Sequence, residues 1–96
     1  MSDILTQVFA TIEDRKANPK PRSYTNSLFD AGEDEIIKKV GEEGAEVVLA
    51  AARQSDERLI SELADLVYHC MVLLASRGLT PDDVSAELAR RHIPRE

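Results

Sequence analysis

The sequence contains a single cysteine, Cys70, and fewer basic than acidic residues. One cysteine excludes an internal disulfide and any metal site built from several thiolates. The 18 acidic and 12 basic residues give a net charge of −6. That balance argues against a protein whose main task is to hold nucleic acid, because such affinity depends on clustered Lys and Arg. We therefore expect no nucleic-acid partner.

Long apolar runs are also missing. The sequence has no uninterrupted stretch of about 18 apolar residues, so we expect no membrane span. The first segment, MSDILTQVFATIEDRK, has no basic start followed by a long apolar run, which is not typical of a signal peptide. These absences together predict a cytoplasmic protein without a membrane partner.

The chain length sets a limit on the core. Its 96 residues, of which 43% are hydrophobic, predict one globular domain spanning residues 1–96. A chain of this size buries only about 60–65% of the surface of its unfolded form. Because the apolar content is high for so thin a core, we expect a homodimer or a higher homo-oligomer.

Strand signals are almost absent, and the N-terminal third reads as helical. Ser2 is expected to cap a first helix, whose apolar face comprises Ile4, Leu5, Val8, Phe9 and Ile12. This helix should end within RKANPKPR, because Pro19 and Pro21 cannot continue it. The following SYTNSLFDAG predicts a short helical turn that stops at Gly32.

Three further helices complete the predicted fold. They span about residues 33–53, about residues 57–77, and a last segment with Thr80 as its N-cap and Pro81 as its first residue. The helix over 57–77 is the most apolar and should be central. Four or five helices with short connections predict an all-α bundle.

Two glycines lie in the middle of the predicted helix 33–53. Gly41 and Gly44 each cost about 1 kcal/mol relative to alanine in a helix interior. We therefore expect them to permit a close approach by another helix or by a ligand.

Two acidic pairs occupy consecutive predicted helices. At about 100° per residue, Glu43 and Glu46 project within about 60° of each other. Glu62 and Asp65 fall on one narrow strip of the next helix. A short connection favours antiparallel packing, which brings the two pairs level. Four carboxylates then face one another across the helix interface.

These carboxylates allow two interpretations. Lys38–Glu42 and Lys39–Glu43 are i,i+4 pairs, so the first acidic group can be a solvated salt-bridge face. Glu62 and Asp65 can likewise be the exposed strip of an amphipathic helix. Alternatively, four carboxylates at close range require a counter-cation, and their oxygens suit Mg²⁺, with Mn²⁺ as a second possibility. Such an ion polarises a phosphoryl oxygen, and a spare carboxylate can orient or deprotonate water. The second interpretation predicts a Mg²⁺-dependent phosphoanhydride hydrolase.

The same residues resemble a known family. The ExxE…ExxD arrangement is similar to that of the all-α nucleoside triphosphate pyrophosphohydrolases. The strings SYTNSLFDAG, KKVGEEGAEVVLAA, ELADLVYHCMVLLASRGL and LARRH resemble those of phosphoribosyl-ATP pyrophosphohydrolases, over about residues 5–92. The resemblance implies Mg²⁺-dependent hydrolysis of phosphoribosyl-ATP to phosphoribosyl-AMP and pyrophosphate, the second step of histidine biosynthesis. It also implies a dimer.

The resemblance assigns roles to the acidic residues. By position, the family's metal-binding quartet corresponds to Glu43, Glu46, Glu62 and Asp65. Glu42 stands beside this quartet, and with Glu43 and Glu46 it forms the expected catalytic group that assists or orients the attacking water.

Several other residues are candidates for substrate binding. Lys38, Lys39 and Arg22 could hold phosphates, with plain surface charge as the alternative. Arg22 stands where small residues are common in the family, so its part in binding is left open. Hydroxyl donors could come from the next three residues, Ser23, Tyr24 and Thr25, although Thr25 is equally a candidate helix cap.

Three residues near Asp65 are expected to be structural. His69, one turn later, is interpreted as a satisfied structural histidine, with a supporting role beside Asp65 as the alternative. Tyr68 should lie in the core or a dimer interface, and Cys70 should be a small buried hydrophobe.

Two other functions remain open from the residues alone. One keeps the chemistry and changes the substrate: an enzyme that removes aberrant or surplus nucleoside triphosphates. The other is a non-catalytic acidic helical module that dimerises or binds a partner helix, for which Glu46→Gln would leave function intact. Substrate preference and Mg²⁺ binding distinguish these three hypotheses.

Overall fold

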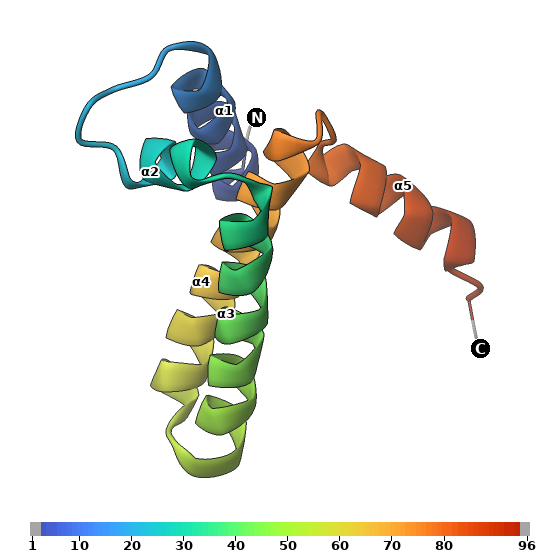
Figure 1. Ribbon diagram of the computed structural model, residues 1–96. Helices are drawn as coiled ribbons and strands as arrows, with labels where there is room; N and C mark the ends of the chain where they lie inside the picture. Colours follow the sequence, from blue (N-terminus) through green and yellow to red (C-terminus); the bar gives the residue numbers. More distant parts are fainter. Residues whose placement is uncertain (1–2, 95–96) are drawn as a thin grey trace.

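The computed structural model describes residues 3–94, which form five helices and no strand. The predicted all-α fold is confirmed. In Figure 1, two long helices run antiparallel as a hairpin, two shorter ones lie across one end of it, and the last helix projects away from that end. In chain order the helices are α1 (Ile4–Ala17), α2 (Tyr24–Ala31), α3 (Glu33–Arg53), α4 (Asp56–Ser76) and α5 (Pro81–Arg91).

The helix boundaries follow local capping. The side chain of Asp3 caps α1 by accepting a hydrogen bond from the Thr6 backbone N–H at 2.8 Å. This cap replaces the predicted one at Ser2, which lies outside the described residues. Ser23 caps α2 by accepting from the Asn26 N–H at 3.2 Å. Of the two alternatives for Thr25, capping of this helix is therefore wrong, because Thr25 is already inside it.

The remaining boundaries match the sequence closely. Gly32, with φ of 101°, ends α2 and begins α3, in a backbone region that favours glycine. Helix α4 begins one residue before the predicted start and ends one residue before the predicted end. Thr80 and Pro81 start α5 as expected, with a capping box between Thr80 and Asp83.

The core lies at the end of the hairpin that α1 and α2 cover. Its buried side chains come from four helices, and they are Phe9, Ile12, Leu28, Ile36, Met71, Val72 and Ala75. Helix α4 contacts each of the other three, which confirms its predicted central place. The core is thin, and several large apolar residues of the hairpin stay exposed: Val48 of α3 is 68% exposed and Ile60 of α4 is 66% exposed.

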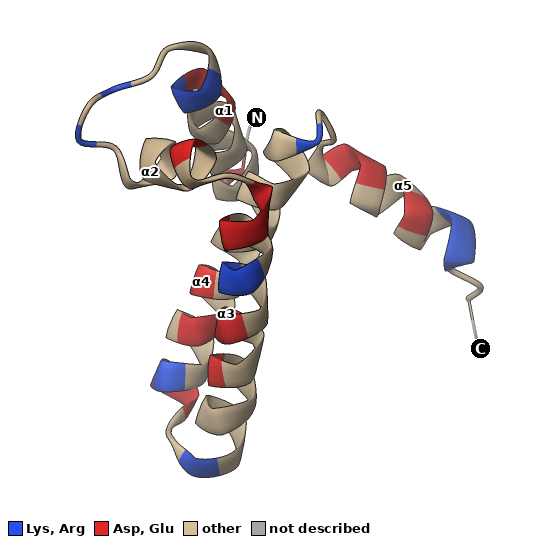
Figure 2. Cartoon of the chain, viewed as in Figure 1, with Lys and Arg blue, Asp and Glu red and all other residues tan. Residues whose placement is uncertain are grey.

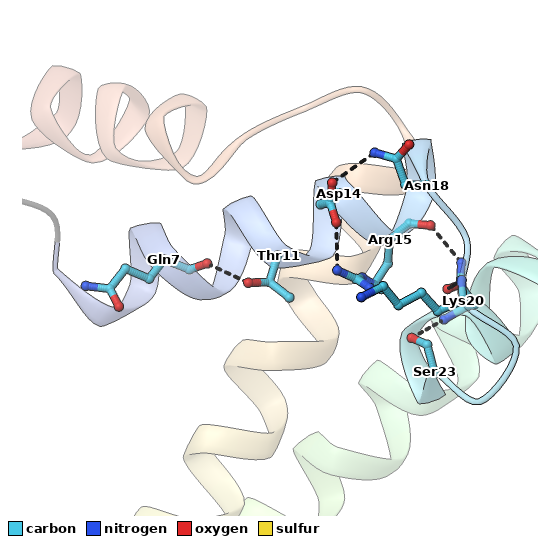
Figure 3. A network of polar contacts seen from close by, with 8 residues as sticks. Gln7, Thr11, Asp14, Arg15, Asn18, Lys20 and Ser23 are labelled. Atoms are coloured by element: carbon cyan, nitrogen blue, oxygen red, sulfur yellow. Dashed lines mark hydrogen bonds and ion pairs between the residues drawn. The ribbon is translucent and has the colours of Figure 1, made fainter.

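A polar network fixes the loop between α1 and α2, and Figure 3 shows Asp14, Arg15, Asn18 and Lys20 within it. The buried side chain of Asn26 accepts from the Lys20 backbone N–H at 2.8 Å and donates to the Arg15 carbonyl at 2.8 Å. Asp14 accepts from both Arg15 and Asn18. These bonds satisfy loop groups that would otherwise be costly to bury, and they hold the start of α2 against the end of α1.

The apolar character of α4 bears on the prediction that no segment spans a membrane. Helix α4 is long and apolar enough to cross a membrane by length and composition alone. That is weak evidence for a membrane span, since the core helix of a soluble protein passes the same test, and α4 packs along α3 here.

The two glycines inside α3 have no close neighbours in the part of the chain that the structure describes. A Cβ added at Gly41 or Gly44 would meet nothing within 4 Å. Within the described residues, no helix of the same chain therefore approaches these glycines closely, and an approach by a ligand or by a helix of a second copy stays a prediction.

Candidate active site

Three carboxylates meet between α3 and α4. Glu43, Glu62 and Asp65 each offer one oxygen, and these oxygens all lie within 4.8 Å of one another. The antiparallel hairpin brings the two acidic motifs level, as the sequence predicted, and Figure 2 shows acidic segments of both helices side by side midway along it. We refer to Glu43, Glu62 and Asp65 as the carboxylate cluster.

The cluster is closed on one side and open on the other. Glu62 is only 5% exposed, whereas Glu43 is half-buried and Asp65 is exposed. A buried carboxylate is costly unless it is paired. The guanidinium of Arg58, one turn earlier on α4, provides that pairing to Glu62. The exposed side at Asp65 leaves room for water or a ligand.

The other two predicted catalytic glutamates lie outside the cluster. Glu46 is exposed and does not belong to the group of three. Glu42 is also exposed, and its carboxylate lies 4.0 Å from the amine of Lys38 and 3.5 Å from that of Lys39. Lys39 thus forms its ion pair with Glu42. The i,i+4 spacing had predicted a pair between Lys39 and Glu43. Such exposed pairs contribute little to stability.

Two adjacent residues of α2 bond to two adjacent residues of α4 beside the cluster. The Tyr24 hydroxyl lies 2.9 Å from His69 Nε2, and the Thr25 hydroxyl contacts the Tyr68 hydroxyl. His69 Nδ1 lies 2.8 Å from the backbone carbonyl of Asp65. His69 is therefore satisfied at both ring nitrogens, as predicted, and it also links Tyr24 to the helix that carries Asp65.

Tyr24 and Lys39 share the electrostatic environment of the cluster. Partial burial raises the pKa of the Tyr24 phenol, with the Lys39 charge opposing this rise and the Glu43 charge adding to it. The pKa of Lys39 is raised, first by its interaction with Tyr24 and then by its bond to Glu42. The Tyr24 hydroxyl and the Lys39 amine are thus electrostatically coupled to each other and to Glu43 of the cluster.

The remaining predicted substrate-binding residues lie farther out. Arg22 is exposed on the loop between α1 and α2, which Figure 2 shows set apart from the acidic segments of the hairpin. The hydroxyl of Ser23 is engaged as the cap of α2. Lys38 is exposed between Glu35 and Glu42, at 4.0 Å from each. Lys39, by contrast, is electrostatically coupled to Glu43 of the cluster.

Tyr68 and Cys70 are only partly buried. Tyr68 packs against the core, as predicted for a core residue, and its ring stacks on that of Tyr24 at 6.2 Å between centroids. Cys70 is intermediate in burial, so it is less buried than the small buried hydrophobe that the sequence predicted. Its surroundings nonetheless raise the pKa of the thiol through desolvation.

The donor set of the cluster fits a hard divalent cation. It consists of carboxylate oxygens, which Mg²⁺ and Mn²⁺ prefer. The nearby imidazole of His69 is not free to act as a ligand, because hydrogen bonds engage both its nitrogens. The exposure of Asp65 is compatible with an ion that keeps water or phosphate oxygens in its shell. The residues present could therefore hold a metal ion.

Sequence comparison decides the family. Residues 5–92 match the family model described as phosphoribosyl-ATP pyrophosphohydrolase. The chain belongs to this family. A protein of Bacillus cereus named phosphoribosyl-ATP pyrophosphatase is 47% identical over 92 residues, which cover 96% of this chain and 86% of the relative. One of Bacillus mycoides with the same name is 48% identical over the same shares.

Membership makes the chain an enzyme of the hydrolase class that acts on a phosphoanhydride. The matched region includes all of α2, α3 and α4, and with them every residue of the carboxylate cluster. The resemblance noted in the sequence is thus confirmed at the level of the family.

Proposed function

We propose that this chain hydrolyses phosphoribosyl-ATP to phosphoribosyl-AMP and pyrophosphate with Mg²⁺ as cofactor, in the second step of histidine biosynthesis. The observation that carries the proposal is the carboxylate cluster, three oxygens within 4.8 Å in a chain of the phosphoribosyl-ATP pyrophosphohydrolase family. Mn²⁺ is the alternative ion for the same ligands.

The metal ligands would be Glu43, Glu62 and Asp65, with Glu46 as a fourth from the next turn of α3. Mg²⁺, when bound, would neutralise phosphate charge and polarise a phosphoryl oxygen, which makes the phosphorus atom more susceptible to attack by water. The ion pair with Arg58 orients the carboxylate of Glu62. Its burial reduces screening by water, which strengthens its attraction for a cation.

The proton of the attacking water would pass to a carboxylate that does not hold the metal. Glu42, which is not among the proposed ligands, is exposed on the same helix as Glu43 and can reach water. In this structure Glu42 is paired with Lys38 and Lys39. If the amines of these lysines bind substrate phosphates instead, the carboxylate of Glu42 loses its ion pairs and can accept a proton from water.

The substrate would lie between the cluster and α2. Lys38 and Lys39 would bind phosphate oxygens, since a divalent ion alone does not balance the charge of a triphosphate and a ribose phosphate. Tyr24 and Thr25 would border the substrate from α2, and Arg22 and Ser23 from the loop before it. Tyr24 is 51% exposed, and its ring offers an aromatic surface beside the cluster.

The working form would be a homodimer or higher homo-oligomer in the cytoplasm, without nucleic-acid or membrane partners. An apolar groove between α1 and α4 supports self-association. It is lined by residues such as Ile4, Ile60, Leu63 and Val67, all of which are exposed in the single chain. Covering such a groove with a second copy removes apolar surface from water, which favours association.

A substrate panel with product analysis tests the proposed reaction. Phosphoribosyl-ATP, ATP and deoxynucleoside triphosphates are each incubated with the protein and Mg²⁺, and the products are identified by ³¹P NMR. We expect pyrophosphate from phosphoribosyl-ATP and little turnover of the others. Comparable turnover of the whole panel would assign the chain to removal of surplus nucleotides. Release of inorganic phosphate in place of pyrophosphate would contradict the proposed bond cleavage.

A further inference from the structure

His69 is a buried histidine that the proposed mechanism does not use. It is 6% exposed and lies on α4 one turn after Asp65 of the carboxylate cluster. Its ring contacts two tyrosine rings edge-on, that of Tyr68 at 5.1 Å and that of Tyr24 at 5.8 Å between centroids. These contacts and its two hydrogen bonds fix the orientation of the ring.

The hydrogen bonds also fix which ring nitrogen carries the proton. The Asp65 backbone carbonyl, 2.8 Å from Nδ1, has no hydrogen to give, so Nδ1 must donate. In the neutral imidazole, Nε2 then carries only a lone pair. The Tyr24 hydroxyl, 2.9 Å from Nε2, must therefore be the donor in their bond.

This assignment determines what Tyr24 can offer a ligand. A phenol has one O–H to donate, and His69 takes it. The oxygen keeps its lone pairs, which remain available to a hydrogen-bond donor. Tyr24 is half exposed, and its hydroxyl is joined through His69 to the backbone of Asp65, a residue of the carboxylate cluster. The free acceptor therefore lies near the cluster, where the proposed substrate would bind.

We infer that His69 is a positioning residue, which holds the Tyr24 hydroxyl as a hydrogen-bond acceptor for a ribose hydroxyl or a base N–H of the nucleotide. The inference rests on the proposed function, because it concerns the same substrate. His69 acts through Tyr24 and does not touch the substrate. Its role is to prevent the hydroxyl from rotating to donate, which would present the wrong group to a substrate donor.

Two substitutions of His69 separate this role from a structural one. In His69→Asn the amide can donate to the Asp65 carbonyl in place of Nδ1, but it has no acceptor at the position of Nε2. In His69→Gln the longer side chain can place its carbonyl oxygen near the Tyr24 hydroxyl. Both His69 substitutions are made in the wild-type protein and in the Tyr24→Phe variant. The kcat and KM of every protein for phosphoribosyl-ATP are then measured with Mg²⁺.

We expect His69→Asn to lower kcat/KM by about 3- to 10-fold, the worth of one hydrogen bond, mainly through KM. His69→Gln should recover most of this loss. In Tyr24→Phe the His69→Asn change should cost nothing further, because the group on which it acts is gone. An equal loss from His69→Asn in both backgrounds, or an equal loss from Asn and Gln, would overturn the inference and leave His69 a structural residue.

The tautomer can be measured without turnover. The chain has two histidines, His69 and His92, so ¹⁵N NMR of the imidazole rings is readily assigned with a His92→Gln variant. We expect a protonated Nδ1 and an unprotonated Nε2 for His69, with the Nε2 signal shifting in Tyr24→Phe. A protonated Nε2 in the neutral ring would overturn the inference. A wild-type protein that turns over no phosphoribosyl-ATP would instead overturn the proposed function, and with it the substrate role of Tyr24.

Discussion

The carboxylate of Glu62 is buried and paired with the guanidinium of Arg58, which lies one turn earlier on α4 and is largely exposed. Glu62 also contributes an oxygen to the carboxylate cluster. One buried carboxylate thus has two possible cationic partners: a side chain of its own helix and a metal ion. Arg58 stabilises Glu62 in this structure, and it would compete electrostatically with a bound metal ion for the same charge.

Arg58→Gln should therefore lower stability without metal and increase the stabilisation that Mg²⁺ provides. The buried Glu62 loses its partner, which costs about 1–2 kcal/mol once the exposure of Arg58 is taken into account. Removal of a nearby positive charge should also tighten Mg²⁺ binding by about 3- to 5-fold. Thermal unfolding with and without Mg²⁺ measures both effects. If Mg²⁺ raises the Tm of the variant no more than that of the wild type, Arg58 and the metal do not share Glu62.

Glu43→Gln and Glu62→Gln should each weaken Mg²⁺ binding by at least about 10-fold, because loss of an outer-shell partner alone costs about 10- to 100-fold. Isothermal titration with Mn²⁺ or Mg²⁺ gives the affinity directly. The matched control is Glu13→Gln, which removes one negative charge from an exposed position on α1. A similar loss in the control would mean that net charge, and not the cluster, attracts the ion.

Ile60→Lys should convert the proposed dimer to a monomer. Ile60 is 66% exposed in the groove between α1 and α4, so a lysine there disturbs no packing within the chain but places a charge in an apolar interface. Light scattering after size exclusion should show half the wild-type mass. Ser61→Lys, exposed on the adjacent position of α4, is the matched control and should keep that mass. A dimeric Ile60→Lys protein would show that another surface mediates association.

Asp3→Asn should remove an acid-sensitive part of the stability of α1. The hydrogen bond from the Thr6 backbone N–H lowers the pKa of Asp3 below its ordinary value of 3.8. A lowered pKa means that the ionised cap stabilises the folded chain above the ordinary value, and that this contribution is lost as the pH falls through the folded value. Asn keeps a cap without a charge.

Urea unfolding of wild type and Asp3→Asn at about pH 6 and about pH 2.5 measures this effect. We expect wild type to be the more stable at the higher pH, and the difference to shrink at the lower pH. A difference that is the same at both would mean that the charge of Asp3 makes no contribution to the cap.

Sequence periodicity was sufficient for the fold because the helix signals are local. Gly32, Pro81 and the break after Arg53 mark boundaries that depend on neighbouring residues alone, and the structure has them there. The short connection between α3 and α4 predicted antiparallel packing, and antiparallel packing places the two acidic motifs side by side. The cluster of Glu43, Glu62 and Asp65 could thus be predicted without knowledge of side-chain positions.

Contacts between distant segments could not be predicted in this way. No periodicity indicates that Tyr24 meets His69, since 45 residues separate them and α2 must first dock on α4. Spacing likewise favoured a Lys39–Glu43 pair, but the rotamers place Lys39 on Glu42. Helix α3 buries only Ile36 and Ala50 among its described residues, because its apolar face extends beyond what one chain can cover.

The most direct test of the central claim is the Mg²⁺ dependence of pyrophosphate release from phosphoribosyl-ATP, measured for wild type and for Asp65→Asn. Asp65 is the exposed member of the cluster, so this change should leave the fold intact. We predict wild-type turnover that EDTA abolishes and Mg²⁺ restores, and a variant that needs at least about 10-fold more Mg²⁺ for half-maximal rate. Turnover that persists in EDTA, or an unchanged Mg²⁺ requirement in the variant, would contradict a metal-dependent reaction at this cluster.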